Sequence, residues 1–564
     1  MRPPSRHPAA PAVPSTLPDA SSWDALRAAF RWSVPGRFNI AVACCDAWAA
    51  IAPERPALVH FDPDAAETFT VLSYAALKTR SEALASDLSR RGVAPGDRVA
   101  ILMPQGHATA VAHMAIYRLG AVAVPLALLF GAEALAYRLE TSGAKAIVTV
   151  GDALARVGEA RPATLGYVYC ADGPAGDAID LPAVLARDDR FPARDTAADD
   201  PALMIFTSGT TGPPKGALHA HRVLIGHVPG VMTHHMPLPL DGDVFWTPAD
   251  WAWAGGLLNV LLPGLMMGVP VVSGRAGKFD PELAFETMGA TRTTRVFMPP
   301  TAIRLCRGIE RPRERFGLAL RTLGSGGEQL GLPAREWAKD ALGISVNEFY
   351  GQTECNLVLS GCAALGVEDA RAIGRPVPGH EVAVVDGSGR PMPTGAIGEI
   401  AVRRPDPVMF LEYWGQPDAT AAKFRGDWML TGDRGLVDGR GLFQFEGRDD
   451  DVITSAGFRI GPGEIEDCLT GHPDVSLAAA VGKPDPVRTE IVKAYVVPRE
   501  GVAPGPDLAA RLRDHVKGRL SAHEYPREIE FVAELPMTTT GKVVRRELRE
   551  RARAEAVEAS NAVT

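Results

Sequence analysis

Short apolar segments alternate with amphipathic segments between residues 73 and 149, and this alternation limits the possible folds more than any other feature of the chain. Strands that each lead into a helix form a parallel sheet covered by helices on both faces, so the sequence predicts an α/β fold. The same alternation resumes at residue 202 and continues to about residue 350. The predicted strands are 97–103, 121–125 and 144–149, and the predicted helices are 73–92, 107–120 and 131–142.

The chain has 564 residues, which is too many for one ordinary hydrophobic core, so we expect at least two domains. Residues 1–25 begin with a run rich in proline and alanine and are expected to form a disordered tail. Residues 26–450 should form a large N-terminal domain of parallel sheets covered by helices. This domain ends in a small β subdomain, where short strands are separated by Gly, Pro and Asp turns between residues 382 and 445. We expect residues 451–564 to form a small α+β C-terminal domain.

Residues 255–272 carry no charge and could suggest a membrane span. The segment contains Pro263, Pro270 and four glycines, whereas a spanning helix needs ~20 apolar residues without such breakers. We therefore expect a buried helix followed by a buried strand, and no membrane span.

The charge balance bears on the possible partners of the chain, and the cysteines bear on its location. The chain has 67 acidic and 59 basic residues, a net charge of −8 and no block of Lys or Arg, so nucleic acid is not an expected partner. This balance gives no long-range attraction for an anionic substrate, so any phosphate must be bound by local groups. The seven cysteines form no CxxC pair, which favours reduced thiols in a cytoplasmic location.

The strongest chemical signal follows the apolar run 202–206 and reads Thr-Ser-Gly-Thr-Thr-Gly-Pro-Pro-Lys-Gly. Glycines let backbone N–H groups approach an anion, hydroxyls add donors, and lysine supplies a compact charge. The sequence therefore predicts a polyphosphate-binding loop, and its spacing differs from the Walker motif of ordinary P-loop ATPases. The predicted loop residues are Thr207, Ser208, Gly209, Thr210, Thr211, Gly212 and Lys215.

This loop resembles the phosphate loop of the adenylate-forming (AMP-binding) superfamily, which includes acyl-CoA synthetases, peptide-synthetase adenylation domains and firefly luciferase. Five further segments resemble the motifs of the family in the same order: 326–329, 350–354, 431–433, 447–459 and 540–542. The branch most similar to this chain is that of the medium-chain and acetyl-CoA synthetases. The resemblance implies that the small C-terminal domain is mobile and rotates about a hinge at Asp450.

The resemblance also implies roles for individual residues in binding ATP. Asp433 would bind the ribose, and a carboxylate that only accepts hydrogen bonds can bind two hydroxyls at once. Arg448 would contact the ribose, and Arg459 would contact the phosphates. The expected adenine-binding strip and the segment between nucleotide and metal contribute Gly326, Gly327, Glu328, Tyr350, Gly351 and Gln352.

The resemblance assigns the catalytic groups to two places. Lys542 would bridge the substrate carboxylate and the α-phosphate, where a positive charge stabilises the negative charge that develops in the transition state. Thr353 would hydrogen-bond the α-phosphate, and Glu354 would bind Mg2+, a hard cation that prefers carboxylate oxygen. Coenzyme A would then take the acyl group, and the expected contacts with coenzyme A are Gly457, Arg488 and Lys517.

The acyl pocket is expected near Trp251, Trp253, Gly324, Ser325 and Gly351. In the acetyl-CoA synthetase branch the residue before Gln-Thr-Glu is typically a tryptophan that shortens the pocket, and here it is Gly351. We therefore expect space for a medium-chain acid, and the tryptophans make an aromatic acid such as benzoate an equal candidate.

Other chemistries have less support. The sequence Gly-Ser-Gly at 324–326 does not have the GxSxG spacing of a serine hydrolase. The clustered histidines lack a convincing set of metal-binding partners and are expected to be structural or surface residues: His219, His221, His234 and His235.

The predicted activity is an AMP-forming acyl-CoA synthetase that uses ATP, Mg2+ and coenzyme A, acting as a monomer or homo-oligomer. The alternatives are an adenylation enzyme that loads a carrier protein and a catalytically silent nucleotide-binding homologue.

Overall fold

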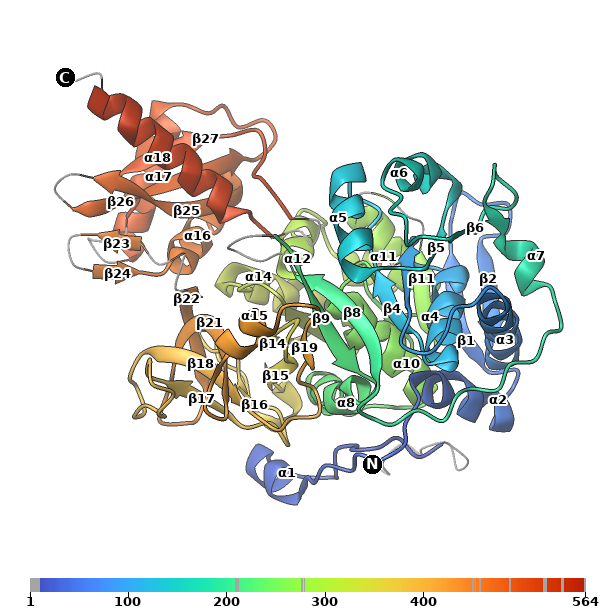
Figure 1. The fold of residues 1–564 in the computed structure, drawn as a ribbon. Coiled ribbons are helices and arrows are strands. Elements are labelled where there is room, and N and C mark those ends of the chain that lie inside the picture. The colour runs from blue at the N-terminus through green and yellow to red at the C-terminus, as the bar shows by residue number, and fades with distance from the viewer. Residues whose placement is uncertain are drawn as a thin grey trace.

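The structure is a computed structural model of the whole chain, and it describes residues 11–207, 213–274, 277, 279–448, 451, 453–455, 458–485, 488–520, 525–538 and 542–561. Figure 1 shows a large body and a smaller domain, which is coloured orange to red and joins the body beyond β22 (Phe443–Arg448). The α/β fold and the division into a large and a small part agree with the sequence-based prediction.

The first large sheet holds the predicted phosphate loop. Its strand order is β19-β9-β8-β4-β3-β5-β6-β7, in which β8 and β9 are antiparallel and the strands from β8 to β7 are parallel. The strands are β3 (Arg98–Leu102), β4 (Val122–Pro125), β5 (Ala146–Thr149), β6 (Tyr167–Cys170), β7 (Ile179–Asp180), β8 (Pro201–Thr207), β9 (Lys215–Ala220) and β19 (Glu412–Tyr413).

The second large sheet holds the predicted adenine strip and the metal-binding segment. Its strand order is β16-β15-β14-β13-β12-β10-β11-β1-β2, and the central strands from β14 to β1 are parallel. The strands are β1 (Pro56–Phe61), β2 (Phe69–Ser73), β10 (Phe245–Trp246), β11 (Val271–Gly274), β12 (Arg295–Phe297), β13 (Thr322–Gly326), β14 (Val346–Gln352), β15 (Asn356–Ser360) and β16 (Arg375–Pro376).

Local signals explain why the predicted helices begin and end where they do. The Ser73 side chain accepts a hydrogen bond from the backbone N–H of Ala76 and starts α3 (Tyr74–Arg90), as N-cap serines do. Gly120 ends α4 (His107–Leu119) in the left-handed conformation, with φ of 73°. The other helices of the large part are α1 (Trp23–Ala29), η1 (Val42–Asp46), α2 (Ala47–Ile51), α5 (Ala132–Ser142), η2 (Gly151–Ala153), α6 (Leu154–Glu159), α7 (Leu181–Leu185), α8 (Val223–His234), α9 (Ala254–Gly256), η3 (Leu257–Leu261), α10 (Leu262–Met267), α11 (Pro281–Ala290), α12 (Pro300–Cys306), α13 (Pro312–Arg315), α14 (Leu332–Trp337), η4 (Ala338–Leu342), η5 (Ala363–Leu365) and α15 (Pro417–Ala422).

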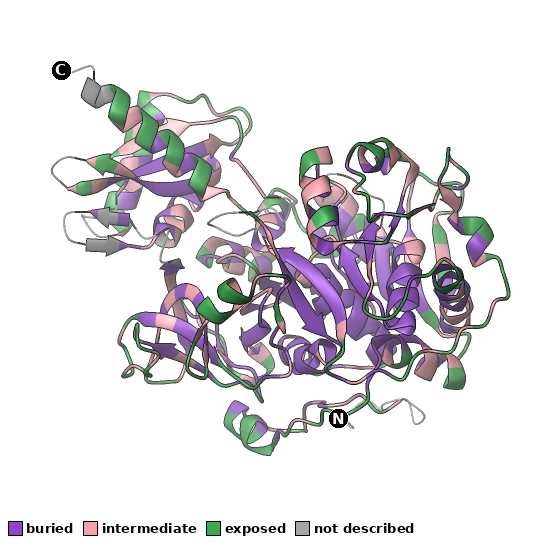
Figure 2. Ribbon diagram, in the orientation of Figure 1, coloured by how far each residue is buried: buried purple, intermediate pink, exposed green. Residues whose placement is uncertain are grey.

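The main hydrophobic core draws on both large sheets and the helices packed against them. Val99 of β3, Leu58 of β1, Val111 of α4 and Leu258 of η3 belong to one buried cluster. Figure 2 shows the buried residues concentrated in the strands and helices of the large body. Residues 255–272 form α9, η3, α10 and the start of β11, so the predicted buried helix and strand are confirmed. No helix within the described ranges is long and apolar enough to cross a membrane.

The β subdomain forms a third sheet. Its order is β17-β18-β21-β20, with β22 also paired to β21. Beside β22, the strands are β17 (Val382–Val385), β18 (Gly398–Arg403), β20 (Phe424–Arg425) and β21 (Trp428–Val437).

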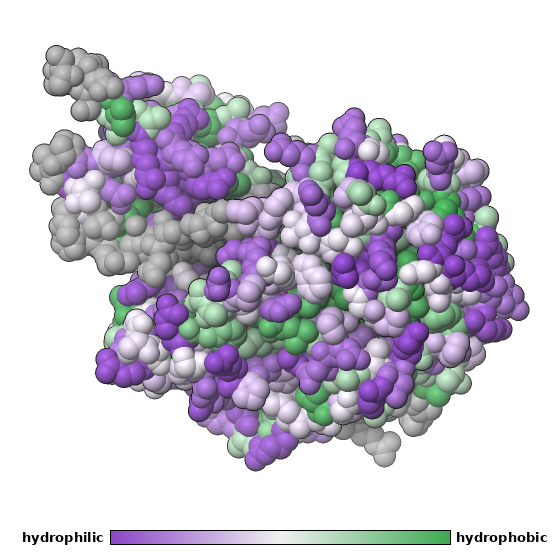
Figure 3. Space-filling model, viewed as in Figure 1, coloured by the Kyte–Doolittle hydropathy of each residue, from purple (hydrophilic) through white to green (hydrophobic). Residues whose placement is uncertain are grey.

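The small C-terminal domain has one sheet packed against three helices. The strands are β23 (Ile453–Ser455), β24 (Phe458–Ile460), β25 (Val475–Asp485), β26 (Thr489–Pro498) and β27 (Glu528–Phe531), and the helices are α16 (Pro462–Thr470), α17 (Pro506–Arg519) and α18 (Arg545–Asn561). On the face drawn in Figure 3, hydrophilic residues dominate the described surface of this domain.

The predicted disordered tail over residues 1–25 is wrong for residues 11–25, and residues 1–10 lie outside the described part of the chain. Leu17 is 5% exposed and Trp23 is 2% exposed. Trp23 packs against Cys362 and Leu442 of the large domain. The Pro- and Ala-rich composition gave no sign of this contact, because it depends on a few buried apolar side chains such as Leu17 and Trp23.

Candidate active site

The predicted phosphate loop connects two antiparallel strands. Thr207 ends β8 and Lys215 begins β9, and the two residues are direct partners in the β8–β9 register. Residues 208–212, which include five of the predicted loop residues, lie outside the described residues. Lys215 and Thr207 therefore mark where both ends of the loop leave the sheet.

Tyr413 lies between Lys215 and Glu354, the predicted metal ligand, and contacts both. Its Nζ lies 5.0 Å from the centre of the Tyr413 ring, a distance typical of a cation–π contact. The Tyr413 hydroxyl donates a hydrogen bond to Glu354 Oε1. Burial and the neighbouring Glu354 raise the pKa of Tyr413, so its hydroxyl remains a donor.

Tyr413 was not among the predicted site residues. It reaches the site because β19 pairs with β9, which places residues almost two hundred positions apart in the sequence side by side. No local pattern around Tyr413 indicates that pairing, although its position between the phosphate loop and the ribose segment could have drawn attention to it.

Thr353 and Glu354 lie in the turn between β14 and β15. The Cys355 N–H donates to the Gln352 carbonyl at 3.2 Å and closes the turn. Glu354 is 7% exposed, and its backbone carbonyl accepts from the Phe410 N–H at 2.8 Å. A buried carboxylate whose side chain is oriented by a hydroxyl donor fits a Mg2+ ligand.

The predicted ribose-binding carboxylate is held by two side chains of the segment between nucleotide and metal. The Tyr350 hydroxyl and the Gln352 amide nitrogen each donate to Asp433 Oδ2 at 2.7 Å. Gln352 also donates to the Thr431 carbonyl at 2.8 Å. Arg448 is the cross-strand partner of Asp433 in the β21–β22 pair, so the backbone brings these two predicted ribose contacts together.

The predicted adenine strip leaves the C-terminal end of β13. Glu328 accepts hydrogen bonds from Thr301 and from Arg304, the latter at 3.0 Å. Gly327 is exposed and has φ of 99°, a conformation that favours glycine. The strip is therefore anchored by its carboxylate and open at Gly327.

The structure brings Lys542 to this open position. A Cβ built on Gly327 would lie 3.6 Å from Lys542 Cε and 4.0 Å from Lys542 Nζ. The lysine loop is itself closed, because the Thr538 N–H donates to the Lys542 carbonyl at 2.6 Å and the Lys542 N–H donates to Thr538 Oγ1 at 3.0 Å. Lys542 and the adenine strip come from different domains, and their contact defines one pose of the small domain.

Near the predicted acyl pocket, two aromatic rings pack against glycines. A Cβ on Gly255 would lie 2.9 Å from Phe297, and one on Gly326 would lie 2.6 Å from Phe349. Phe297 and Phe349 have ring centres 5.4 Å apart. Trp251 is buried, and Trp253 is partly exposed and immediately precedes α9.

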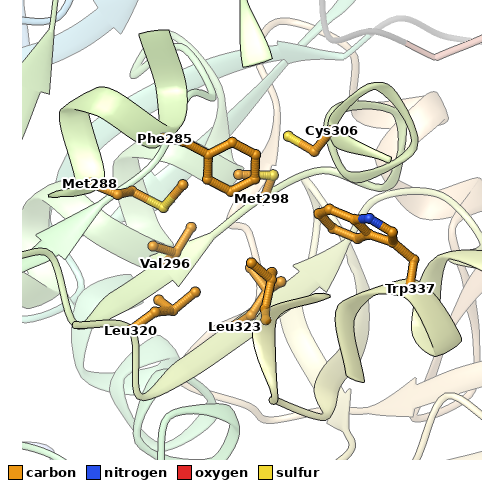
Figure 4. A pocket seen from close by; sticks show the side chains of 9 residues that line it. Phe285, Met288, Val296, Met298, Cys306, Leu320, Leu323 and Trp337 are labelled. Carbon is orange, nitrogen blue, oxygen red and sulfur yellow. The ribbon is translucent and has the colours of Figure 1, made fainter. Parts of the chain in front are cut away.

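Two of the predicted pocket residues, Gly324 and Ser325, point to opposite faces of the sheet. A Cβ on Gly324 would lie 2.6 Å from His234, which places Gly324 on the α8 face of β13. Side chains alternate along a strand, so Ser325 points to the opposite face, like its register partner Glu348. Leu323, which shares a face of β13 with Ser325, lines an apolar void of about 10 Å³ drawn in Figure 4, which is too small for an acid. The side chains at positions 324 and 325 therefore cannot line the same pocket, and the assignment of Ser325 to the acyl pocket stays a prediction.

The argument that Gly351 opens pocket volume is wrong. A Cβ on Gly351 would lie 1.2 Å from the Asn356 carbonyl oxygen, so the β15 backbone occupies the space that a side chain would need. The β14–β15 register shifts between Tyr350 and Gly351, and this irregularity brings Asn356 against the glycine. A missing side chain opens a pocket only when the neighbouring backbone leaves the space empty.

The clustered histidines are buried and have no metal-binding arrangement among the described residues. Burial lowers the pKa of His219 and His234 to about 3 and that of His221 to about 4, so these rings are neutral at pH 7. His235 binds Thr322 Oγ1 at 2.7 Å. The prediction that they are structural residues agrees with this burial.

The predicted coenzyme A contacts remain predictions. Arg488 lies at the β25–β26 turn, where its N–H donates to Asp485 at 2.8 Å, and Lys517 is exposed on the last turn of α17. Gly457 and the hinge residue Asp450 lie outside the described residues. Arg459 belongs to β24, where its backbone pairs with Thr454.

Comparisons with known proteins agree with this geometry. Residues 45–414 match the AMP-binding enzyme family, and residues 464–542 match the AMP-binding enzyme C-terminal domain. The chain is 32% identical to acetyl-coenzyme A synthetase of Bacillus subtilis, over 91% of this chain and 90% of that protein. It is also 32% identical to human mitochondrial acyl-coenzyme A synthetase ACSM4, over 92% of this chain and 91% of that protein.

Solved structures give the same result. An acyl-CoA synthetase of Brucella canis is 32% identical, with a TM-score of 0.73 and coverage of 94% of this chain and 99% of that one. A benzoate CoA ligase of Burkholderia xenovorans is 27% identical, with a TM-score of 0.79 and coverage of 91% of this chain and 100% of that one. The fold and site thus define an adenylate-forming acid–CoA ligase.

The chain belongs to the AMP-binding enzyme family. It is an AMP-forming acyl-CoA synthetase whose substrates are ATP with Mg2+, a carboxylic acid and coenzyme A.

Proposed function

We propose that the enzyme activates a medium-chain fatty acid or an aromatic acid. The carboxylate oxygen attacks the α-phosphorus of ATP, which forms acyl-AMP and releases pyrophosphate. The coenzyme A thiolate then attacks the acyl carbonyl, and AMP leaves with the electron pair of the broken bond. Neither step needs a protein nucleophile, so catalysis depends on positioning and charge.

The contact between Lys542 and Gly327 carries the proposal for the first step. A cation beside the adenine strip lies where negative charge develops as the carboxylate attacks phosphorus. Asp433 accepts hydrogen bonds from the ribose hydroxyls, and Thr353 donates to the α-phosphate. Mg2+ bound with ATP offsets phosphate charge, and Glu354 is the residue that would hold it.

The aromatic walls support the choice of acid. Phe297 packs against Gly255 and Phe349 packs against Gly326, and the two rings are neighbours. Trp253 immediately precedes α9. Flat apolar rings favour the flat face of an aromatic acid or the methylenes of an alkyl chain over a short, strongly hydrated acid. A similar benzoate CoA ligase supports the aromatic option.

The test is pyrophosphate release with ATP and Mg2+ across C2 to C12 and aromatic acids, with and without coenzyme A. We expect C4 to C8 acids or benzoate-like acids to exceed acetate, and thioester to form only when coenzyme A is present. Each methylene contributes only about 1–3 kcal/mol to discrimination, so several acids should react. Acetate exceeding all others by about tenfold would refute the choice of acid.

We also propose a cytoplasmic location, because all seven cysteines are free thiols and six of them are buried. Thioester formation on an added carrier protein instead of coenzyme A would redirect the proposal to a carrier-loading enzyme. Sedimentation of the purified enzyme would distinguish a monomer from a homo-oligomer.

A further inference from the structure

Helix α16 of the small domain lies against Gln329, the last residue of the adenine strip, and against the segment that follows it. A Cβ built on Gly463 would lie 2.1 Å from Gln329 Oε1, and a Cβ on Gly331 would lie 2.4 Å from Asp467 Oδ1. Arg307 also donates to the Thr470 carbonyl at the end of α16, at 3.4 Å. Together with the contact between Lys542 and Gly327, these contacts belong to the interface between the two domains in the observed pose.

Gly463 is not required by its own backbone. It lies in the first turn of α16 and is not among the glycines with positive φ, so most residues could adopt its conformation. Gly331, in contrast, has φ of 80° and would be glycine for conformational reasons alone. The end of the Gln329 side chain, from the other domain, occupies the space that a side chain at position 463 would need.

An ion pair connects α16, the helix that contains Gly463, to the segment that carries Lys542. Arg545 follows the lysine loop and binds Glu466 of α16, with its Nε 3.0 Å from Glu466 Oε1. Arg545 also lies 3.6 Å from Asp451, next to the predicted hinge. The lysine loop and α16 therefore move as one body, and the depth at which α16 docks sets how far Lys542 reaches.

We propose that Gly463 is a positioning residue that forms a socket for Gln329 and so controls the approach of Lys542 to the adenine strip. This inference rests on the proposed two-step reaction. A larger side chain at position 463 holds the small domain away from Gln329 and keeps Lys542 out of the first step. The second step does not use Lys542, so it is spared.

The test compares the two half-reactions in Gly463→Leu. Acyl-AMP formation, measured as pyrophosphate release with the best acid, should fall by about tenfold or more, because a packed interface does not accept added volume. Thioester formation from supplied acyl-AMP should stay within about twofold of the wild type, since a docking contact used in one step acts on that step alone. Gly463→Ala should show a smaller loss, because the end of the Gln329 side chain can move aside.

Two further variants separate this role from a loss of folding. Gly505→Leu is the matched control, since Gly505 also lies at a helix N-terminus of the small domain, has φ of 170° and has open space around it. It should leave both steps unchanged. The double variant Gln329→Ala with Gly463→Leu removes as many non-hydrogen atoms as it adds, so it should recover much of the acyl-AMP formation.

Equal loss of both half-reactions, no loss in Gly463→Leu, or no recovery in the double variant would each refute the socket. If wild-type enzyme forms no acyl-AMP with any acid, the proposed function fails instead. The socket is then tested by hydrogen exchange of residues 462–470, which should be faster in Gly463→Leu than in wild type. Unchanged exchange would refute it.

Discussion

Replacing Tyr413 by phenylalanine tests how the buried metal-binding carboxylate is held. The substitution removes the hydroxyl that donates to Glu354 and keeps the ring that lies 5.0 Å from Lys215 Nζ. Glu354 is only 7% exposed, so water cannot easily replace the lost donor. The Glu354 side chain would then lose the group that orients it toward ATP and its Mg2+.

The expected size of the effect follows from this burial. A hydrogen bond to a buried charged group contributes about 1.5–3 kcal/mol, and about 1.4 kcal/mol corresponds to a factor of ten. Loss of a group that orients a metal ligand typically costs about 10–100-fold in metal affinity or activity. We therefore expect the Mg2+ concentration for half-maximal acyl-AMP formation to rise by roughly tenfold or more in Tyr413→Phe.

The assay is pyrophosphate release at fixed ATP and acid while Mg2+ is varied. Tyr413→Leu is the matched comparison, because it removes the ring as well and should add a loss of ATP affinity through Lys215. Thioester formation from supplied acyl-AMP serves as the folding control and should change little. An unchanged Mg2+ requirement in Tyr413→Phe would show that the hydroxyl does not support Glu354.

Three further predictions address the nucleotide site and the core. Lys542→Ala should lower acyl-AMP formation by about 100-fold or more while keeping most thioester formation from supplied acyl-AMP, and equal loss of both would refute a lysine specific to the first step. Asp433→Asn should raise the KM for ATP by roughly tenfold, because the ribose loses a charged acceptor; an unchanged KM would exclude ribose binding there. Burial lowers the pKa of His113, His219 and His234 from 6.5 to about 3, so the unfolded chain binds more protons than the folded chain between these values. Stability should be full above about pH 6.5 and fall below it by up to about 1.4 kcal/mol per pH unit for each ring, and thermal unfolding that is constant from pH 8 to 5 would contradict this.

The residues predicted for the nucleotide site lie in short local segments, and the structure brings several of these segments together. Asp433 lies in the predicted ribose turn, and its two donors Tyr350 and Gln352 lie in the predicted neighbouring segment. The strands and helices around these segments follow from local periodicity and caps, such as Ser73 at the start of α3. The local motifs therefore indicated the groups, and the packing of the second large sheet against the antiparallel β subdomain brought them together.

The acyl pocket could not be predicted in the same way. Ser325 was assigned to it from its neighbours in sequence, but the two faces of a strand separate adjacent residues. Gly351 was read as space, but a register shift fills that space with the Asn356 backbone. Tyr413 and the docked segment around Trp23 depend on pairings across long stretches of chain, which no local pattern shows.

A two-step mechanism needs an interface between the two domains that can form and separate in each cycle. Among the described residues, polar groups contribute to the contact between α16 and the large domain, as in the hydrogen bond from Arg307 to the Thr470 carbonyl and the approach of Gln329 to Gly463. A large hydrophobic interface would hold Lys542 against Gly327 throughout the cycle, and the lysine would then obstruct the thiol. Weak polar docking gives a pose that can be left at little cost, as expected of domains that move during catalysis. The steric fit at Gly463, rather than strong attraction, then determines where the lysine stops.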